Sequence, residues 1–329
     1  MPPLLQIKEL VTVFDTNRGR IKAVNGVSLI LQTGETLGIV GESGCGKTML
    51  ALSIMRLIPA NGSIIEGTIS FQGDDLLKLL PEEMRAKRGN EIAMVFQEPM
   101  TSLNPVLRIG EQIAEALRLH SNLSAKEAMA LSIEQLREVG IPDPERRARD
   151  YPHQLSGGMR QRVMIAMAMS CHPRLLLADE PTTALDVTIQ AQILDLIADL
   201  KKKNNMAVIL ITHDLGIISQ TAENVAVMYA GKIVENSPTI DIFANPLHPY
   251  TRGLIDSLPA GCGPSGRQLP EHLQTIPGSV PSLYNLAKGC SFRDRCSRAF
   301  SPCADQEPKL MEIKSGHFVA CFWAQQTKH

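Results

Sequence analysis

The sequence predicts an α/β fold built on a parallel sheet, and three observations lead to this prediction. Apolar stretches of strand length alternate with helical patterns from about Ile7 to Met228, as expected of strands joined by covering helices. The most informative of these stretches run into polar residues. The chain of 329 residues also suits one large domain with an appendage, or two domains, at roughly 150 residues per domain.

Four predicted strands lead into residues that could carry chemistry. They are Leu37–Val40 before a glycine-rich turn, Ile92–Phe96 before Gln97, Leu175–Ala178 before Asp179, and Ala207–Ile211 shortly before His213. In open α/β sheets, ligands bind beyond the carboxyl ends of the strands. We therefore expect these side chains along one edge of the sheet.

The region between the second and third strands is predicted to be helical. Helices are expected over 109–120 and 124–139, followed by a proline-containing turn at 141–144, and a further helix over 163–169. The stretch 189–200 also places apolar residues at helical spacing. We expect a helical subdomain at about 99–160, inserted into the sheet.

The composition changes from about Leu258, where prolines interrupt any long periodic element. We therefore divide the chain into a main domain at 1–257 and a C-terminal extension at 258–329. Four of the seven cysteines lie in the extension with the spacing C-x5-C-x6-C-x17-C, namely Cys290, Cys296, Cys303 and Cys321.

Composition narrows the class of protein. The net charge of -1 argues against a nucleic-acid binder that relies on overall basic charge, although local basic patches remain open. The longest apolar run, Val163–Met169, has seven residues and reaches nine at Cys171 only by including Ser170, about half of what a membrane-spanning helix needs. Because no signal segment is evident either, we expect a cytosolic protein, in which clustered cysteines favour metal binding over disulfides.

A phosphate-binding loop is predicted directly after the first of these strands. The segment Gly41-Glu-Ser-Gly-Cys-Gly-Lys-Thr48 matches the pattern in which glycines let backbone N–H groups surround phosphate oxygens. Lys47 would reach the β and γ phosphates, and the Thr48 hydroxyl could bind Mg²⁺. The alternative is a glycine-rich turn that happens to contain a lysine; Cys45 is interpreted as filling space in the loop.

Two consecutive carboxylates complement this loop. Asp179 could support the Mg²⁺ ion, and Glu180 could polarise a water molecule for in-line attack on a phosphate. Because apolar runs that end in Asp-Glu are common, a solvated strand end remains an alternative.

A third motif identifies a family. Leu155-Ser-Gly-Gly-Met159 precedes the apolar stretch 163–169. Taken in order with the phosphate loop, Gln97, Asp179-Glu180, the turn Ala184-Leu-Asp186 and His213, it makes the chain resemble the nucleotide-binding subunits of ABC transporters over about 5–250. The resemblance implies a P-loop, RecA-like ABC nucleotide-binding domain with an inserted helical subdomain.

The resemblance also implies roles for individual residues. The loop residues Gly41, Ser43, Gly44, Cys45, Gly46, Lys47 and Thr48 would cradle ATP, with Met49 standing where the family has a threonine. The Mg²⁺ ion would be held by Thr48, Asp179 and Gln97. Gln97 would also sense whether the nucleotide is bound. Glu180 would be the general base and His213 would contact the γ phosphate.

Other implied roles belong to a dimer. Ser156, Gly157 and Gly158 would bind the γ phosphate of ATP held by an opposite subunit, and Asp186 would lie at the dimer seam. Phe14 is at about the position of the family's adenine-stacking aromatic residue, and a core phenylalanine is the alternative.

The C-terminal part narrows the resemblance. The runs His248-Pro-Tyr-Thr251 and Pro277-Gly-Ser-Val-Pro281 resemble those of ATPases of oligopeptide, dipeptide and nickel importers. Such a protein would pair with a second, related ATPase as a heterodimer and bind two permease subunits. It would serve an extracytoplasmic substrate-binding protein indirectly, lie peripherally on the cytoplasmic membrane face, and bind no nucleic acid. A soluble ABC ATPase acting on nucleic acid or the ribosome, and a redox- or iron-responsive regulator, are the competing classes.

The four C-terminal cysteines are predicted to hold a 4Fe-4S cluster, because some peptide-importer ATPases carry one here. Their loose spacing weakens a zinc site, which usually has closer pairs, whereas a cluster tolerates varied spacing. Zinc and metal-free cysteines remain alternatives. Three arginines lie between the cysteines, namely Arg293, Arg295 and Arg298. They would offset the negative charge of a cluster, and a solvated basic loop is an equally good explanation for their presence.

Overall fold

The computed structural model describes residues 2–98, 102–183, 185–258, 275–284, 286 and 288–326. The chain divides into two compact units. Unit 1 combines residues 1–77 with 210–329, and unit 2 comprises residues 78–209. The first part of the predicted C-terminal extension, 259–274, lies outside the described residues, as does Ala184 of the predicted turn.

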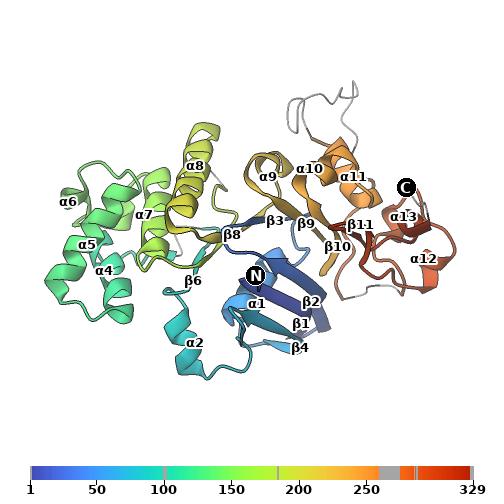
Figure 1. Cartoon of the computed structure of the whole chain (residues 1–329), viewed down its shortest axis with the longest axis horizontal. Helices are drawn as coiled ribbons and strands as arrows, with labels where there is room; N and C mark the ends of the chain where they lie inside the picture. Colours follow the sequence, from blue (N-terminus) through green and yellow to red (C-terminus); the bar gives the residue numbers. More distant parts are fainter. Residues whose placement is uncertain are drawn as a thin grey trace. The chain divides into compact units, whose positions relative to one another are not determined.

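One sheet of unit 1 is antiparallel and formed near the N-terminus. Strands β1 (Leu5–Thr16) and β2 (Gly19–Leu31) form a hairpin, and β4 (Gly62–Phe71) and β5 (Asp74–Asp75) extend it in the order β2-β1-β4-β5. The register pairs Leu5 with Leu31 and Phe14 with Gly62. This sheet and helix α1 (Lys47–Met55) are drawn in blue in Figure 1.

The second sheet of unit 1 carries the predicted strand before the glycine-rich turn. Strand β3 (Thr36–Val40) is buried throughout and pairs in parallel with β9 (Asn224–Tyr229). Strand β10 (Lys232–Pro238) returns antiparallel through Ala230 and Gly231, whose φ angles of 46° and 83° suit a two-residue hairpin turn. Strands β12 (His317–Val319) and β11 (Met311–Lys314) continue the order β11-β12-β10-β9-β3.

Short helices complete unit 1. They are α9 (Leu215–Thr221), α10 (Thr239–Ala244) and α11 (Pro249–Asp256). The described residues from 275 to 326, called the C-terminal segment below, add η2 (Arg293–Arg295), α12 (Pro302–Asp305) and α13 (Phe322–Gln326) to β11 and β12. A small core of Leu247, Val319, Cys321 and Ala324 joins α13 to the sheet.

Unit 2 contains the helical region that the sequence predicts. After α2 (Pro81–Lys87) and β6 (Ile92–Val95) come α4 (Ile109–His120), α5 (Ala125–Glu138), α6 (Pro144–Arg147), η1 (Pro152–Gln154) and α7 (Gly157–Met169). Strand β7 (Leu175–Asp179) pairs in parallel with β6, and α8 (Val187–Asn204) follows. Helices α4, α5 and α7 form one group (Figure 1).

The predicted helix boundaries follow from local signals. Ser124 caps α5, since its hydroxyl accepts the Glu127 N–H while the Glu127 carboxylate accepts the Ser124 N–H. The turn expected at 141–144 runs into α6, because Pro144 fits the first position of a helix. The chain passes from unit 2 to unit 1 within β8 (Ala207–Thr212). The described residues contain no helix long and apolar enough to cross a membrane.

Candidate functional site

The predicted phosphate loop joins β3 to α1 in unit 1. Gly46 caps α1 with a φ of 108°, and a Cβ added there would lie 2.1 Å from the carbonyl oxygen of Ala23. Only glycine fits this close approach. The loop therefore presents backbone N–H groups and the N-terminus of a nine-residue helix, an arrangement that favours anions.

Lys47 is folded back into this loop. Its ammonium Nζ donates to the carbonyl oxygens of Gly41, at 2.7 Å, and Glu42, at 3.1 Å, and the residue is 5% exposed. The Cys45 thiol lies 3.8 Å from Nζ and is buried, which raises its pKa. A protonated, buried thiol agrees with the interpretation of Cys45 as a space-filling residue.

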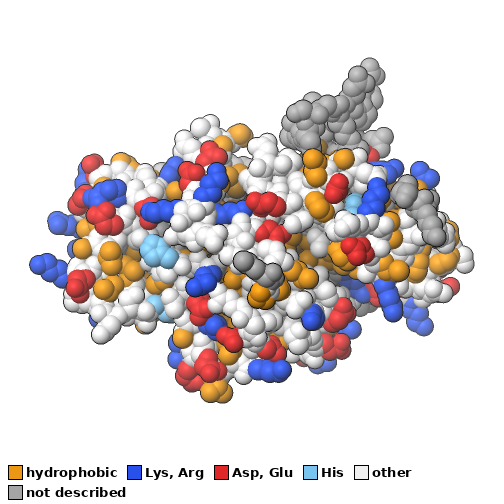
Figure 2. All heavy atoms as spheres, viewed as in Figure 1, with side chains coloured by type: hydrophobic (Ala, Val, Ile, Leu, Met, Phe, Trp, Pro, Cys, Tyr) orange, Lys and Arg blue, Asp and Glu red, His pale blue; other side chains and the backbone are white. Residues whose placement is uncertain are grey.

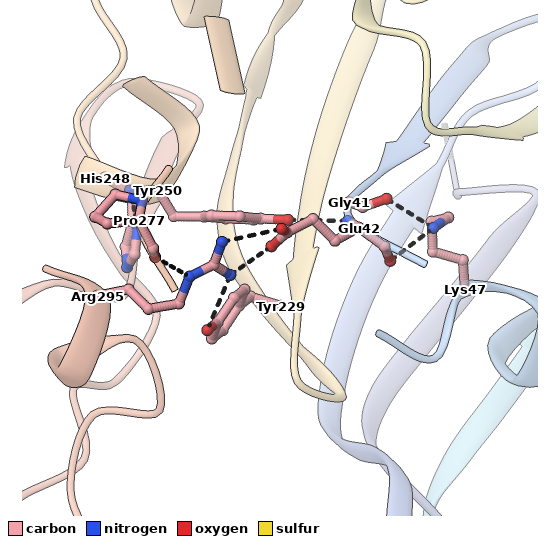
Figure 3. A network of polar contacts seen from close by, with 8 residues as sticks. All are labelled: Gly41, Glu42, Lys47, Tyr229, His248, Tyr250, Pro277 and Arg295. Atoms are coloured by element: carbon pink, nitrogen blue, oxygen red, sulfur yellow. Dashed lines mark hydrogen bonds and ion pairs between the residues drawn. The ribbon is translucent and has the colours of Figure 1, made fainter. Parts of the chain in front are cut away.

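Residues far away in the sequence contact the same loop (Figure 3). The Glu42 N–H donates to the Tyr250 hydroxyl at 2.9 Å. The Arg295 guanidinium donates to both carboxylate oxygens of Glu42, at 2.7 and 3.0 Å. The sequence does not predict these contacts. Glu42 stands at a variable position of the loop motif, Tyr250 lies in a run that resembles importer ATPases, and Arg295 is expected to balance the charge of a cluster.

The two predicted carboxylates follow β7 in unit 2. Asp179 is 2% exposed at the end of the strand, whereas Glu180 has a left-handed backbone with φ 47°. One Glu180 oxygen accepts hydrogen bonds from Thr183 Oγ1 at 2.8 Å and Gln97 Nε2 at 3.1 Å. Strands β6 and β7 are parallel neighbours, so Gln97 and Asp179 follow adjacent strand ends, as expected from the sequence, and Glu180 comes directly after Asp179.

The predicted signature motif forms the start of α7 in unit 2. The Ser156 hydroxyl accepts the Met159 N–H at 3.3 Å and caps the helix. A Cβ added to Gly158 would approach Ile189 of α8 to 2.9 Å. Asp186 caps α8 by accepting the Ile189 N–H at 2.9 Å. Both predicted dimer-facing residues therefore also stabilise helix ends within their own subunit.

Two further predicted residues lie in unit 1. His213 is exposed directly after β8. Phe14 is 8% exposed in β1, and its ring packs so closely over Gly62 that a Cβ there would lie 2.5 Å away. This burial agrees with the alternative that Phe14 belongs to the core.

The four C-terminal cysteines line one cavity of about 10 Å³. Burial raises the pKa of Cys290, Cys296 and Cys321, the last to about 11. Within the described ranges, no three His, Cys, Asp or Glu side chains are arranged to hold a metal ion. The four cysteines therefore line one cavity, but their side chains are not arranged as the ligands of a metal ion. Arg295, predicted to balance a cluster, instead pairs with Glu42.

A larger cavity, of about 960 Å³, also lies in unit 1 and shares the lining residues His248, Cys290, Phe292 and Pro308 with the cysteine cavity. It is lined by parts of β1, β2 and β10 and by residues of the C-terminal segment, including Phe292 and Pro308. Among the described residues, none of the loop positions 41–48 contributes to it. This cavity is therefore not the predicted phosphate-binding site.

Comparisons with known proteins agree with these motifs. A family model described as ABC transporter matches residues 24–183, and one described as oligopeptide/dipeptide transporter, C-terminal region, matches residues 234–303. The chain is 52% identical over 320 residues to a probable peptide ABC transporter ATP-binding protein of Sinorhizobium fredii, covering 97% of this chain and 94% of that protein.

Further relatives cover almost the whole chain. The oligopeptide transport ATP-binding proteins AppD of Bacillus subtilis and OppD of Escherichia coli are 50% and 48% identical, covering 98% and 97% of this chain and 97% and 93% of theirs. The ATP-binding cassette MJ0796, solved as a dimer with ADP and Pi, is 27% identical with a TM-score of 0.65, covering 71% of this chain and 98% of its own. The chain therefore belongs to the ATP-binding subunits of ABC transporters, a family of ATPases, within the group that carries the oligopeptide/dipeptide C-terminal region.

Proposed function

We propose that this chain powers the import of di- or oligopeptides through a membrane ABC transporter. The observation that carries this proposal is its similarity of about 50% identity, over nearly its full length, to proteins named as peptide or oligopeptide transport ATP-binding proteins. The matched C-terminal region supports the same transporter group. Import of nickel or another solute by the same mechanism is the alternative cargo.

ATP binds at the phosphate loop in this proposal. The backbone N–H groups of Gly41, Ser43, Gly44, Cys45 and Gly46 surround the phosphates, and Lys47 exchanges its carbonyl partners for β and γ phosphate oxygens. Thr48, Asp179 and Gln97 have the oxygen ligands that Mg²⁺ prefers. Met49 follows Thr48 in α1 and does not supply a hydroxyl.

Hydrolysis uses the carboxylate that follows β7. Glu180 orients and deprotonates the attacking water, and the hydrogen bonds from Thr183 and Gln97 hold its carboxylate in position. His213 contacts the γ phosphate as negative charge shifts during cleavage. Gln97, bonded to Glu180, reports whether the γ phosphate is present.

Two subunits complete each ATP site. The start of α7, with Ser156, Gly157 and Gly158, is a helix N-terminus that suits the γ phosphate of ATP held by an opposite subunit. Asp186 lies at the seam. A solved relative is a dimer, and we propose that here the partner is a second, related ATPase, giving a heterodimer.

The motion passes to two permease subunits, with the chain held peripherally on the cytoplasmic membrane face. Unit 2 offers apolar side chains for such contacts: Val106, Leu119 and Leu131 are 75%, 73% and 41% exposed. Hydrophobic side chains lie among charged ones over α4 and α5 (Figure 2). Phe96, which precedes Gln97 in the sequence, is 37% exposed and offers a further apolar side chain for such a contact. An extracytoplasmic binding protein delivers the peptide.

The assembled transporter tests this proposal. The chain is co-expressed with the permeases and the second ATPase that are encoded beside it. The complex is reconstituted in vesicles, and its ATP hydrolysis is measured in the presence of the purified binding protein. Peptide-loaded binding protein should stimulate hydrolysis, and Glu180→Gln should abolish the stimulation. Stimulation by nickel alone would contradict the peptide cargo, and stimulation by nucleic acid without permeases would contradict transport. A stable, fully coupled homodimer would contradict the heterodimer.

We also propose that Cys290, Cys296, Cys303 and Cys321 hold a 4Fe-4S cluster, with zinc as the alternative. Their convergence on one cavity supports the proposal, and thiolates are the usual ligands of such clusters. The cluster would cross-link four points of a segment that has few regular elements. Protein purified without oxygen should be brown, absorb at about 400 nm and contain about four irons per chain. Colourless protein with one zinc per chain would contradict the cluster.

A further inference from the structure

Arg295 makes a two-pronged ion pair with the phosphate loop. Its two terminal nitrogens lie 2.7 and 3.0 Å from the two carboxylate oxygens of Glu42. The Arg295 side chain is 5% exposed and that of Glu42 is 30% exposed. Paired donors in this fork geometry fix orientation as well as distance, and partial burial shields the pair from the solvent screening that weakens surface ion pairs.

Glu42 is held through its backbone as well. Its N–H donates to the Tyr250 hydroxyl at 2.9 Å, and its carbonyl oxygen accepts from Lys47 Nζ at 3.1 Å (Figure 3). One residue of the loop therefore connects Arg295 and Tyr250 to the lysine that binds phosphate. A displacement of Glu42 would move the loop amides and the partner of Lys47 together.

Arg295 is itself firmly placed. Its Nε donates to the Pro277 carbonyl oxygen at 2.8 Å, and its guanidinium carbon lies 5.9 Å from the ring centres of both Tyr229 and Phe292. These rings belong to an aromatic group in which Tyr229 and Tyr250 are 4.6 Å apart, and Tyr250 and Phe292 are 5.4 Å apart. The hydrogen bond to Glu42 is the main reason that the pKa of Arg295 is raised, so its charge is permanent.

The negative charge of Glu42 explains why the position of Arg295 matters for nucleotide binding. A carboxylate inside a loop that binds phosphates repels the same anions that the loop attracts. The Arg295 guanidinium offsets this charge by donating to both carboxylate oxygens, and the hydrogen bond from the Glu42 N–H to the Tyr250 hydroxyl fixes the backbone of the same residue.

We propose that Arg295 and Tyr250 are positioning residues that hold the phosphate loop in its ATP-binding conformation, so that the C-terminal segment sets the affinity of the loop for nucleotide. The one-turn helix η2 that carries Arg295 is flanked by Cys290 and Cys296. Cys296 directly follows Arg295 in the chain, and the ion pair of Arg295 with Glu42 connects this position to the loop. The inference rests on the ATPase activity of the family and not on the peptide cargo.

ATP affinity of the full-length subunit tests the proposal. Arg295→Met should raise the Kd for MgATP about tenfold, because the paired hydrogen bonds to Glu42 are lost. The methionine side chain replaces the apolar stem of the arginine, so its packing is retained. In the Glu42→Gln background, the same Arg295→Met change should raise Kd less than threefold. Arg298→Met is the matched control, since Arg298 lies in the same segment over the Trp323 ring, at 5.0 Å, and it should leave Kd within twofold.

The assembled transporter separates positioning from chemistry. Arg295→Met should raise KM for ATP about tenfold and change kcat at saturating ATP less than threefold, whereas a loss of kcat alone would contradict a positioning role. Arg295→Lys, which keeps the charge and one hydrogen bond, should recover part of the affinity. If Arg295→Met does not fold, Arg295→Lys carries the same test. An unchanged Kd in a folded variant, or a tenfold effect that persists in the Glu42→Gln background, would overturn the proposal.

Discussion

The phosphate loop and the start of α7 are held in place in different ways. The loop at 41–48 depends on partners far along the chain: Tyr250 is 208 positions and Arg295 is 253 positions from Glu42. The start of α7 is capped by Ser156, three positions from the N–H that it binds. Glu180 is likewise held in part by Thr183, three positions away.

The two regions should therefore be sensitive to different substitutions. A locally capped helix start tolerates changes elsewhere in the chain, because its hydrogen bonds are made by neighbours in sequence. A loop held by distant side chains depends on the folding of the segments that carry them. We therefore expect nucleotide binding to respond to changes in the C-terminal segment, and the residues after β7 and before α7 to respond mainly to substitutions at their own positions.

The largest effect is expected at Glu180, the proposed general base, where a local substitution should be severe. Glu180→Gln keeps an oxygen that can accept from Thr183 and Gln97 but removes the base, so turnover should fall about 100-fold or more. ATP binding, measured with a fluorescent nucleotide, should be retained. Glu115→Gln, at an exposed carboxylate of α4, is the control. Near-normal turnover of Glu180→Gln would remove Glu180 from this role.

A smaller effect is expected at His248, whose backbone N–H donates to Glu235 of β10 and whose ring centre lies 5.6 Å from that of Phe292 in the C-terminal segment. His248 caps α11 by accepting the Tyr250 N–H, and burial lowers its pKa to about 4 from 6.5. The unfolded chain therefore binds more protons between these values, and stability falls as the pH drops through this window. His248 should account for a loss of about 2 kcal/mol between pH 7 and pH 5.

Urea unfolding at several pH values measures this loss. His248→Asn keeps an oxygen suited to capping and should flatten the acid side of the stability profile by that amount. His172→Asn is the control, because His172 is exposed with φ 51°, a backbone conformation that asparagine tolerates. Identical acid sensitivity in the native chain and His248→Asn would contradict the assignment.

The smallest effect is expected at the local cap. Ser156→Ala removes the acceptor for the Met159 N–H and should lower the free energy of unfolding by about 1 kcal/mol. Ser156→Thr should restore most of it, because threonine can cap a helix in the same way. Denaturant unfolding of the three proteins checks the difference. If Ser156→Ala were as stable as the native chain, the capping bond would contribute nothing.

The same contrast explains what could be predicted from the sequence. Strand β3 and helix α4 follow from local patterns of polarity, and the structure confirms both. The pairing of Gln97 with Glu180 follows from two adjacent parallel strands. The contact of Arg295 with Glu42 has no local signal, because neither periodicity nor motif spacing connects residues so far apart. Arg295 was therefore assigned to its sequence neighbours, the cysteines.

Hydrogen exchange of the backbone amides reports local opening of the phosphate loop and of the start of α7 separately. The native chain and Arg295→Met are compared in full-length form, following residues 41–48 and 157–160. We predict that exchange at 41–48 becomes at least severalfold faster in Arg295→Met, while exchange at 157–160 is unchanged. Equal exchange at 41–48 in the two proteins would contradict the claim that the C-terminal segment holds the phosphate loop.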